Sequence, residues 1–260
     1  LVQNGDFSQI GSEEVSNGSF SQEGSELITN GDFATDTDWI KGSGWTISGG
    51  KANSDGTINQ TIAQSNVFTI GKSYKVNFTI SDVVGSLDAR VWMATGGGKI
   101  NVNANGEYTT YWEADGTGLA ITVLSLNTAS FSIDNVSVKE VGQNWNLGNG
   151  WSIGDNKLIG DGSTSGYTTQ ANVFTPNVNK SYKLTLEVKD YTSGYFKILT
   201  NGSTYQSGTI SGNGLKELYF NSGTPTNGTM LISWSGSFNG SITNISVKEV
   251  GQGWVLNSNW

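Results

Sequence analysis

The chain contains no cysteine and no histidine among its 260 residues. Without cysteine it cannot form a disulfide bond, a thiolate zinc site or a cysteine nucleophile. Without histidine it lacks the Ser-His-Asp triad, the usual general base at neutral pH and the commonest ligand of transition metals. Paired carboxylates, as used in glycoside hydrolysis, are the remaining route to catalysis.

The candidates for such a carboxylate pair are Glu107, Glu113 and Asp115, which lie close together in the sequence. Scattered acids in a glycine-rich β-protein are usually solvated turn residues. The second copy of the repeat described below carries no acids at a matching spacing. We therefore expect no enzymatic activity and assign no catalytic residue.

Basic charge is also scarce. The formal net charge is −8, and residues 1–40 hold eight acids with no lysine or arginine. The rest of the chain is neutral, so no region has the basic excess that supplies phosphate contacts, and we expect no nucleic-acid binding. No apolar run approaches the 18–20 residues of a membrane span, which argues against membrane insertion. No signal peptide opens the sequence, and we interpret it as a fragment or a processed piece.

Long internal repeats dominate what is present. Residues 133–143 return as residues 242–252 at an offset of 109, and Lys72-Ser-Tyr-Lys75 returns as Lys180-Ser-Tyr-Lys183. Self-similarity at a long period indicates an array of equivalent modules. We predict one module over residues 27–143 and a second over residues 144–252. Residues 253–260 match the start of the second module and predict the first strand of a truncated third.

Residues 1–26 form a leader with a shorter repeat. Asn4-Gly-Asp-Phe7, Asn17-Gly-Ser-Phe20 and Asn30-Gly-Asp-Phe33 are spaced 13 residues apart. Each unit has too few apolar side chains to offset a backbone ordering cost of about 1–2 kcal/mol per residue. The leader is therefore either a flexible acidic linker or a segment that pairs with copies from other chains. The second alternative predicts a homotrimer.

The module sequences predict strands. Tyr74, Val76, Phe78 and Ile80 alternate with polar residues, as expected for an antiparallel sheet with one buried face. The closing strand over residues 133–138 alternates less cleanly, which suggests cover on both sides. Asn-Gly and Asp-Gly pairs mark many hairpin turns, and no segment has a sustained helical period. We expect an all-β fold of tandem β-sandwich modules of jelly-roll type with almost no helix.

Tryptophans recur six residues apart at the same point of each module. A feature repeated in this way is more typical of packing than of recognition, so we expect core or inter-module contacts for Trp39, Trp45, Trp145, Trp151, Trp254 and Trp260. Other aromatic residues differ between the modules. Among these, we predict that Trp92, Trp112 or Tyr195 lines a glycan-facing surface, since pyranose rings bind aromatic faces. Drifting core residues would differ in the same way.

Several of these motifs together resemble a known class of proteins. Asn30-Gly-Asp-Phe33, Trp39, Gly44-Trp-Thr-Ile-Ser-Gly-Gly-Lys-Ala52 and the closing segment 133–141 resemble modules of bacteriophage tail fibres and other virion appendages. They are also similar to carbohydrate-binding modules with a galactose-binding-like jelly roll. The resemblance covers residues 27–252 and implies a virion or cell-surface location with glycan contact.

The resemblance also implies a structural calcium that joins the opening segment to the closing strand. The matching residues are Asp32 and Asp134, whereas the second module has Thr243 at the latter position and no such opening of its own. Calcium takes six to eight oxygen ligands, and two side chains are identified. The alternative is an Asx-type turn at Asp32 and a solvated Asp134.

Three functions follow as expectations. The first is a virion fibre, most like a phage tail fibre, that spaces and presents host-surface glycan-binding modules and contacts other virion proteins. The second is a structural or capsid-decorating fibre without a ligand. The third is a secreted or cell-surface bacterial adhesin, or a glycan-binding module of a larger enzyme.

Overall fold

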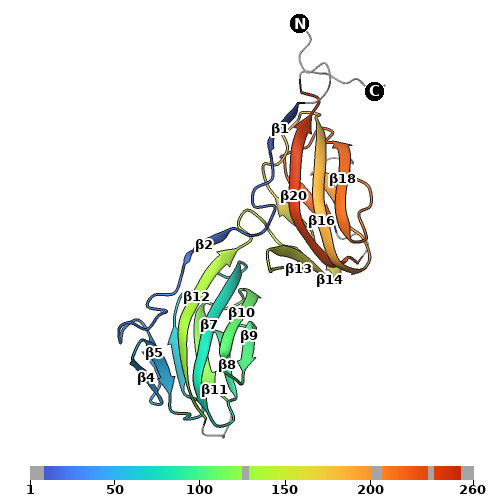
Figure 1. The fold of residues 1–260 in the computed structure, drawn as a ribbon. Coiled ribbons are helices and arrows are strands. Elements are labelled where there is room, and N and C mark those ends of the chain that lie inside the picture. The colour runs from blue at the N-terminus through green and yellow to red at the C-terminus, as the bar shows by residue number, and fades with distance from the viewer. Residues whose placement is uncertain (1–8, 125–128, 201–206, 234–236, 253–260) are drawn as a thin grey trace. The chain divides into compact units, whose positions relative to one another are not determined.

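The computed structural model describes residues 9–124, 129–200, 207–233 and 237–252. Regular structure in these ranges is β-strand throughout, which confirms the predicted all-β class. The described ranges contain no helix, and hence none that could cross a membrane. The chain forms two compact units. The first module is Glu23–Val141, and the second module joins the described residues up to Gln22 to those from Gly142 onward (Figure 1).

The first module is built from two antiparallel sheets. The larger has the order β10-β7-β12-β5-β4, with β2 also paired to β12, and the smaller has the order β3-β6-β11-β8-β9. The strands are β2 (Glu23–Glu26), β3 (Ile40–Lys41), β4 (Trp45–Ser48), β5 (Lys51–Ser54), β6 (Thr61–Gln64), β7 (Ser73–Val84), β8 (Ala89–Ala94), β9 (Lys99–Val102), β10 (Gly106–Glu113), β11 (Gly118–Val123) and β12 (Ser130–Val141).

One hydrophobic core lies between these sheets. β7 alternates between buried and half-buried residues, as its sequence predicts, and contributes Val76 and Phe78. The smaller sheet contributes Val91 and Ile121 to the same cluster. From β5 to β8 each successive strand changes sheet. This crossing pattern over a shared core makes the module a β-sandwich of jelly-roll type.

The second module repeats this plan with a smaller second sheet. Its larger sheet has the order β13-β14-β20-β16-β18, with β1 also paired to β20, and its three-stranded sheet has the order β15-β19-β17. The strands are β1 (Ile10–Glu13), β13 (Asn149–Gly154), β14 (Lys157–Ser165), β15 (Thr168–Gln170), β16 (Ser181–Ser193), β17 (Lys197–Thr200), β18 (Gly214–Asn221), β19 (Met230–Ser233) and β20 (Asn239–Val250).

A β-bulge explains the irregular alternation in the closing strand of each module. The β12–β7 register shifts between Asp134 and Ser137, and Asn135 has a φ of 53°. Asn244 occupies the same place in β20 with a φ of 54°. A bulge moves the inward-facing set by one residue, and asparagine tolerates the left-handed conformation. The bulge accounts for the irregular alternation at residues 134–137, and the expected cover on both faces is present where residues 131–133 and 240–243 are buried in succession.

The predicted core tryptophans are confirmed in the described residues. Trp39, Trp45, Trp145 and Trp151 are all buried. The first tryptophan of each pair contacts the phenylalanine of an Asn-Gly-x-Phe motif. The ring centroids of Phe33 and Trp39 are 5.0 Å apart, and those of Phe20 and Trp145 are 5.1 Å apart. Trp254 and Trp260 lie outside the described residues.

In the first module, residues 27–33 continue from β2 along β12. The Val136 N–H donates to the Gly31 carbonyl at 2.9 Å, and a Cβ on Gly31 would lie 2.0 Å from the Val136 carbonyl oxygen. Glu26 accepts hydrogen bonds from the Val138 and Ile28 N–H groups at 2.8 and 3.0 Å. Residues 23–33 therefore cover the free edge of β12, and we call them the opening segment of the first module.

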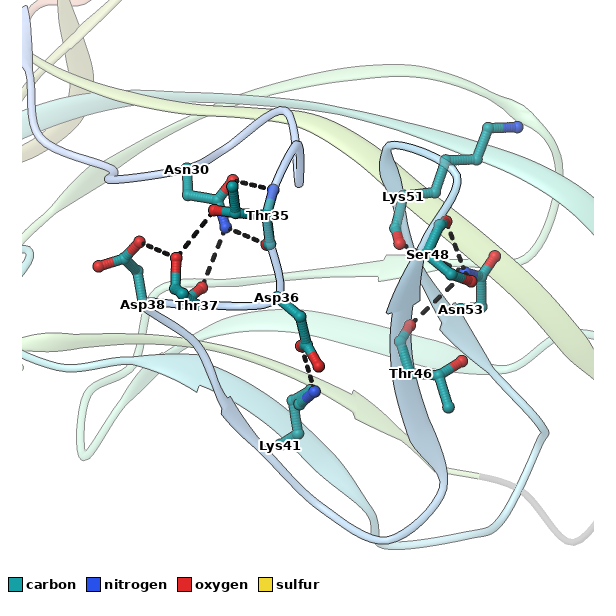
Figure 2. Close-up of polar contacts among 10 residues, drawn as sticks. All are labelled: Asn30, Thr35, Asp36, Thr37, Asp38, Lys41, Thr46, Ser48, Lys51 and Asn53. Carbon is teal, nitrogen blue, oxygen red and sulfur yellow. Dashed lines mark hydrogen bonds and ion pairs between the residues drawn. The ribbon is translucent and has the colours of Figure 1, made fainter.

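The asparagine of the motif closes the loop that follows it (Figure 2). The Asn30 side chain accepts from the Thr35 N–H at 3.2 Å and donates to the carbonyls of Thr35 and Thr37 at 2.7 and 3.0 Å. Thr37 in turn donates to Asp38 at 2.7 Å. Beside it, Asp36 pairs with Lys41. These contacts fix the loop that connects the Asn30-Gly-Asp-Phe33 motif to Trp39.

The second module has an equivalent opening segment, residues 10–20, which precedes the first module in the chain. The Ile245 N–H donates to the Gly18 carbonyl at 2.9 Å. Glu13 accepts from the Val247 and Val15 N–H groups at 2.8 and 3.1 Å. These bonds match those of Gly31 and Glu26 one for one. The second module therefore does have an Asn-Gly-x-Phe opening, contrary to the expectation from sequence.

The first module is thus inserted in the chain of the second. Glu23 and Val141 are partners in the β2–β12 pairing, so the module begins and ends at adjacent backbone positions. Asn17 accepts from the Gln22 N–H at 3.1 Å and donates to the Gln143 carbonyl at 3.4 Å, which holds both sides of the insertion. Adjacent termini are the condition under which a domain inserts into another without disrupting it.

These contacts correct the prediction for the leader. Its described residues form no separate linker; residues 10–22 belong to the second module and residues 23–26 to the first. Their apolar side chains gain the cover that the short repeat lacks by itself, because each segment packs on a complete module of the same chain. The trimer stays a prediction, but the described leader residues no longer require it.

Candidate functional site

The predicted site residue Trp92 lies on β8 of the first module. Ala89, Val91 and Met93 on this strand are fully buried in the core. Because side chains alternate along a strand, Arg90 and Trp92 lie on the opposite, outer face of the smaller sheet. Trp92 is half-buried there, so part of its side chain is accessible to solvent, as predicted for a residue that lines a surface.

Small side chains lie beside the indole. Residues directly opposite each other in an antiparallel pair share a face. Trp92 pairs with Ala120, Ala120 with Ala63, and Ala63 with Ile40, which is 66% exposed. Lys99 pairs with Trp92 on the other side. The alanine methyl groups are too short to cover the indole on one side, and Lys99 flanks it on the other.

Arg90 and Thr122 fix the orientation of Trp92. The guanidinium carbon of Arg90 lies 4.7 Å from the centre of the indole, in a cation–π arrangement. The Trp92 Nε1–H donates to the Thr122 hydroxyl at 2.9 Å, and that hydroxyl is 3.0 Å from the Thr61 hydroxyl. We call Arg90, Trp92, Thr122 and the row Ile40, Ala63, Ala120 and Lys99 the Trp92 platform.

The platform also has an unused hydrogen-bond donor. Arg90 is the only arginine of the chain, and its Nε is buried without a hydrogen-bond partner among the described residues. An unsatisfied buried donor costs about 1–3 kcal/mol. Because this Nε atom is itself buried, the unsatisfied donor lies beneath the surface that a ligand would contact. The platform therefore combines an aromatic surface with a charged donor next to it.

The other two predicted aromatic residues are not part of this surface. Trp112 is 6% exposed and lies in the core, 6.1 Å from Phe68 between ring centroids. The prediction that it faces a glycan is therefore wrong, because its side chain points between the sheets. Tyr195 is half-buried in the segment between β16 and β17 of the second module. Trp112 therefore belongs to the core of the first module, and Tyr195 belongs to the second module.

The residues predicted to bind calcium are engaged in local hydrogen bonds. Asp32 accepts from the Ala34 N–H at 3.3 Å, which is the Asx-type turn given as the alternative, and Asp134 accepts from the Asn135 N–H at 2.6 Å. The described residues hold no group of three acidic side chains that could bind a metal ion. This donor set does not fit the six to eight oxygens that calcium takes. Calcium titration of the intact chain and of Asp134→Ala tests this prediction directly.

The candidate acids do not form a cluster. Both oxygens of Asp115 accept the Gly97 N–H at 2.8 Å, so this carboxylate holds the turn between β8 and β9. Glu107 and Glu113 lie exposed at opposite ends of β10. A glycosidase needs two carboxylates on either side of one bond, and these three residues do not provide such a pair.

The matching face of the second module has a different chemistry. Leu199 on β17 pairs with Leu231 on β19, which pairs with Thr169 on β15. Leu199 and Leu231 occupy the positions of Trp92 and Ala120, and Lys197 occupies that of Arg90. The paired residues Leu199, Leu231 and Thr169 of the second module therefore include no aromatic side chain, although the exposed Tyr167 directly precedes β15.

Sequence reasoning missed an exposed pair on the larger sheet of the second module. Leu215 and Tyr219 on β18 are 74% and 63% exposed. The Tyr219 hydroxyl donates to Glu217 at 3.1 Å, and the Lys183 ammonium lies 5.8 Å from the tyrosine ring centre. Alternation along residues 215–219 puts these side chains on one face and is the signal that could have found them.

No protein-family model matches the chain, and no curated protein matches it. Among solved structures, the CBM22-1–CBM22-2 tandem domain of Xyn10C from Paenibacillus barcinonensis is 12% identical, with a TM-score of 0.36 over 88% of this chain and 99% of that chain. The tandem CBM51 modules of the family 98 glycoside hydrolase Sp3GH98 from Streptococcus pneumoniae SP3-BS71 are 10% identical, with a TM-score of 0.24 over 93% and 96%. At these scores the likeness carries no argument about a ligand.

Proposed function

We propose that this chain is a non-catalytic, multi-module glycan-binding protein and that the Trp92 platform of the first module is its binding surface. The observation that carries the proposal is the indole of Trp92, held on an outer sheet face between Ala120 and Lys99. The apolar face of a pyranose ring stacks on such an indole, and the positive charge of Arg90 lies beside it.

The platform is suited to weak binding of an extended saccharide. It is a sheet surface with one aromatic side chain, so a single platform contributes little affinity. Copies of such a module on one particle would raise the effective affinity through avidity. This supports the role of spacing and presenting binding modules more than that of a high-affinity receptor for a small molecule.

We further propose a virion appendage, most like a tail fibre, as the setting, with host-surface glycans and other virion proteins as partners and a homotrimer as the assembly. The motifs quoted above support this setting through their resemblance to fibre modules. Light scattering at micromolar concentration tests the trimer, and immunogold labelling of intact particles tests the location. A monomer, or a label confined to bacterial cell surfaces, would contradict the respective part.

The test of the binding function is a glycan array followed by titration of the best ligand with the intact chain. Trp92→Ala should weaken binding at least about tenfold, which corresponds to about 1.4 kcal/mol. It should lower the unfolding temperature only modestly, because the half-buried indole loses its contacts with Thr122 and Arg90 but none in the core. Leu199→Ala, at the matching position of the second module, is the control and should bind as the parent chain does.

A structural fibre without a ligand is the second candidate. The specific observation in its favour is that the two modules keep the same opening-segment contacts but differ at the platform. An array with no bound glycan would support this candidate. Binding that Trp92→Ala leaves intact would move the site elsewhere, and the exposed Tyr219 surface would be tested next.

A further inference from the structure

A pair of lysines recurs on the outer face of the larger sheet in each module. Lys75 of β7 is the cross-strand partner of Lys139 of β12, and Lys183 of β16 is that of Lys248 of β20. Both pairs come from the long repeat of the sequence. Like charges directly opposite each other on a sheet are destabilising. An anion beside each pair would remove this cost.

The first module supplies such an anion from its own chain. The two carboxylate oxygens of Glu23 on β2 lie 2.8 Å from the Lys75 ammonium and 3.1 Å from the Lys139 ammonium. Hydrogen bonds from the two lysines hold the pKa of Glu23 below its ordinary value. One carboxylate thus neutralises both lysines, and it marks the place where an anion binds to such a pair.

The second module has no carboxylate at this place. Ile10 of β1 stands where the first module has Glu23, at the matching position of the pairing with the closing strand, and it is 51% exposed. Lys183 pairs with Glu217 at 3.0 Å. Lys248 forms no ion pair with another residue that the structure describes. The lysine pair of the second module is therefore only partly neutralised.

A surface hollow of about 190 Å³ lies at this lysine pair. It is lined by Ile10, Lys183, Thr185, Ser246 and Lys248, and we call it the lysine hollow. Thr185 and Ser246 are cross-strand partners, so two hydroxyl groups lie next to the two ammonium groups. By the register of the strands, the lysine hollow lies where the first module holds the Glu23 carboxylate.

We propose that the lysine hollow of the second module binds the carboxylate of an acidic saccharide, such as a uronic acid. The two lysines would hold the carboxylate through charge-assisted hydrogen bonds, and the hydroxyls of Thr185 and Ser246 would contact sugar hydroxyls. Tyr219 is the cross-strand partner of Lys183 on the other side and is 63% exposed, so an aromatic ring lies beside the site.

Two acids lie near the lysine hollow, and both are engaged in other bonds. Glu13 stands opposite Lys248 but accepts hydrogen bonds from backbone N–H groups. Glu217 accepts from Lys183 and from the Tyr219 hydroxyl. An ammonium group has three donors. Lys183 therefore keeps two of them for a ligand, and Lys248 keeps all three.

A saccharide fits this site better than an acidic protein segment does. β1 already pairs with β20 at this point, so an added strand would find no free backbone groups of β20 there. The side chains that line the lysine hollow instead lie on the face of the sheet, where they offer ammonium and hydroxyl groups. The site is separate from the Trp92 platform, which belongs to the first module, and different variants test the two.

The experiment is a titration of the intact chain with trigalacturonate at low ionic strength, with the neutral galactose trisaccharide as the matched ligand. The parent should bind the acidic saccharide at least about tenfold more tightly than the neutral one. Ile10→Glu restores the carboxylate of the first module and should weaken acidic binding at least about tenfold. Ile10→Gln has a similar shape without the charge and should stay within about threefold of the parent.

The reverse exchange in the first module is the second arm. Glu23→Ile removes the carboxylate between Lys75 and Lys139, and the titration should then show one additional acidic saccharide bound per chain. Lys248→Gln alters an exposed face of the second module and should weaken acidic binding at least about fivefold. It gives an independent result if Ile10→Glu lowers the unfolding temperature.

Three results would overturn the proposal. The first is equal affinity of the parent for the acidic and the neutral saccharide. The second is acidic binding that Trp92→Ala abolishes while Ile10→Glu and Lys248→Gln retain it, which would place the site on the first module. The third is binding of the peptide Glu-Gly-Ser-Glu without binding of trigalacturonate, which would assign the lysines to an acidic protein segment.

Discussion

The two modules share their opening segments almost contact for contact, yet they obtain them differently. In the first module, five residues separate Phe33 from Trp39. In the second, the whole first module lies between Phe20 and Trp145. The contacts nevertheless agree, including the paired glutamates Glu13 and Glu26. The comparison teaches that the opening segment is defined by the edge it covers rather than by its distance along the chain.

The outer faces of the smaller sheets differ between the two modules, whereas the opening segments are alike. The first module presents Trp92 beside Arg90, and the second presents Leu199 beside Lys197. Contacts that build the sandwich are retained in both copies, whereas the surface that would meet a ligand is not. This is the pattern expected when folding constrains one set of residues and recognition another.

Phenylalanine removal gives the largest expected difference between the modules. Phe20→Ala should destabilise the second module by about 3–5 kcal/mol, because it empties a buried ring site, and should leave the first unchanged. Phe33→Ala should do the reverse. Hydrogen exchange resolved by module measures both effects. Equal effects of Phe20→Ala on the two modules would mean that they unfold as one unit.

The paired glutamates should give a smaller and symmetric effect. Glu13 and Glu26 each accept backbone N–H groups of the closing strand, and a hydrogen bond to a charged group contributes about 1.5–3 kcal/mol. Glu13→Ala should lower the stability of the second module by this amount, and Glu26→Ala that of the first. Hydrogen exchange measured at increasing denaturant concentrations gives the stability of each module separately. If only one of the two substitutions destabilised its own module, the matching hydrogen bonds of Glu13 and Glu26 would not contribute equally to stability.

An acid-dependent difference should follow from Glu23, whose counterpart in the second module is Ile10. Hydrogen bonds from Lys75 and Lys139 lower the pKa of Glu23. The stability that Glu23 contributes is therefore present above its unfolded pKa and is lost as the pH falls through the lower folded pKa. Solvent screening limits it to less than about 1 kcal/mol. Glu23→Gln should destabilise the first module at pH 7 but not at pH 2; a loss of equal size at both values would rule out this origin.

The smallest expected effect comes from Glu14, which stands where the first module has Leu27. Burial raises the pKa of Glu14, although the Lys180 ammonium opposes the shift. A raised folded pKa makes the ionised carboxylate unfavourable as the pH rises above its unfolded value. Glu14→Leu should stabilise the second module by a few tenths of a kcal/mol at pH 7 and less at pH 4. Thermal unfolding at the two pH values measures this, and a destabilised protein would contradict it.

Local sequence patterns predicted the regular parts of the fold. Alternation from Tyr74 to Ile80 identified β7 and its buried face, and the tryptophan spacing identified core residues. Trp112 was misplaced because Tyr111 and Trp112 are adjacent, and a shift of one residue exchanges the two faces of a strand. The sequence there offers two aromatic choices and does not decide between them.

The partner of the second leader motif could not be inferred from local patterns. Asn17-Gly-Ser-Phe20 is visible as a repeat, but the strand that it covers lies more than 200 residues away. Its own residues do not specify this pairing, because an identical edge exists in the first module. In the structure the matching edge of the first module is covered by residues 23–33, and Asn17-Gly-Ser-Phe20 lies on the edge of β20.

The most direct test of this insertion is hydrogen exchange after deletion of residues 1–22. The second module should lose protection along β20, above all at Ile245 and Val247, whose N–H groups bond to the opening segment. The first module, which keeps residues 23–33, should exchange as in the intact chain. Unchanged protection of β20 after the deletion would contradict the account.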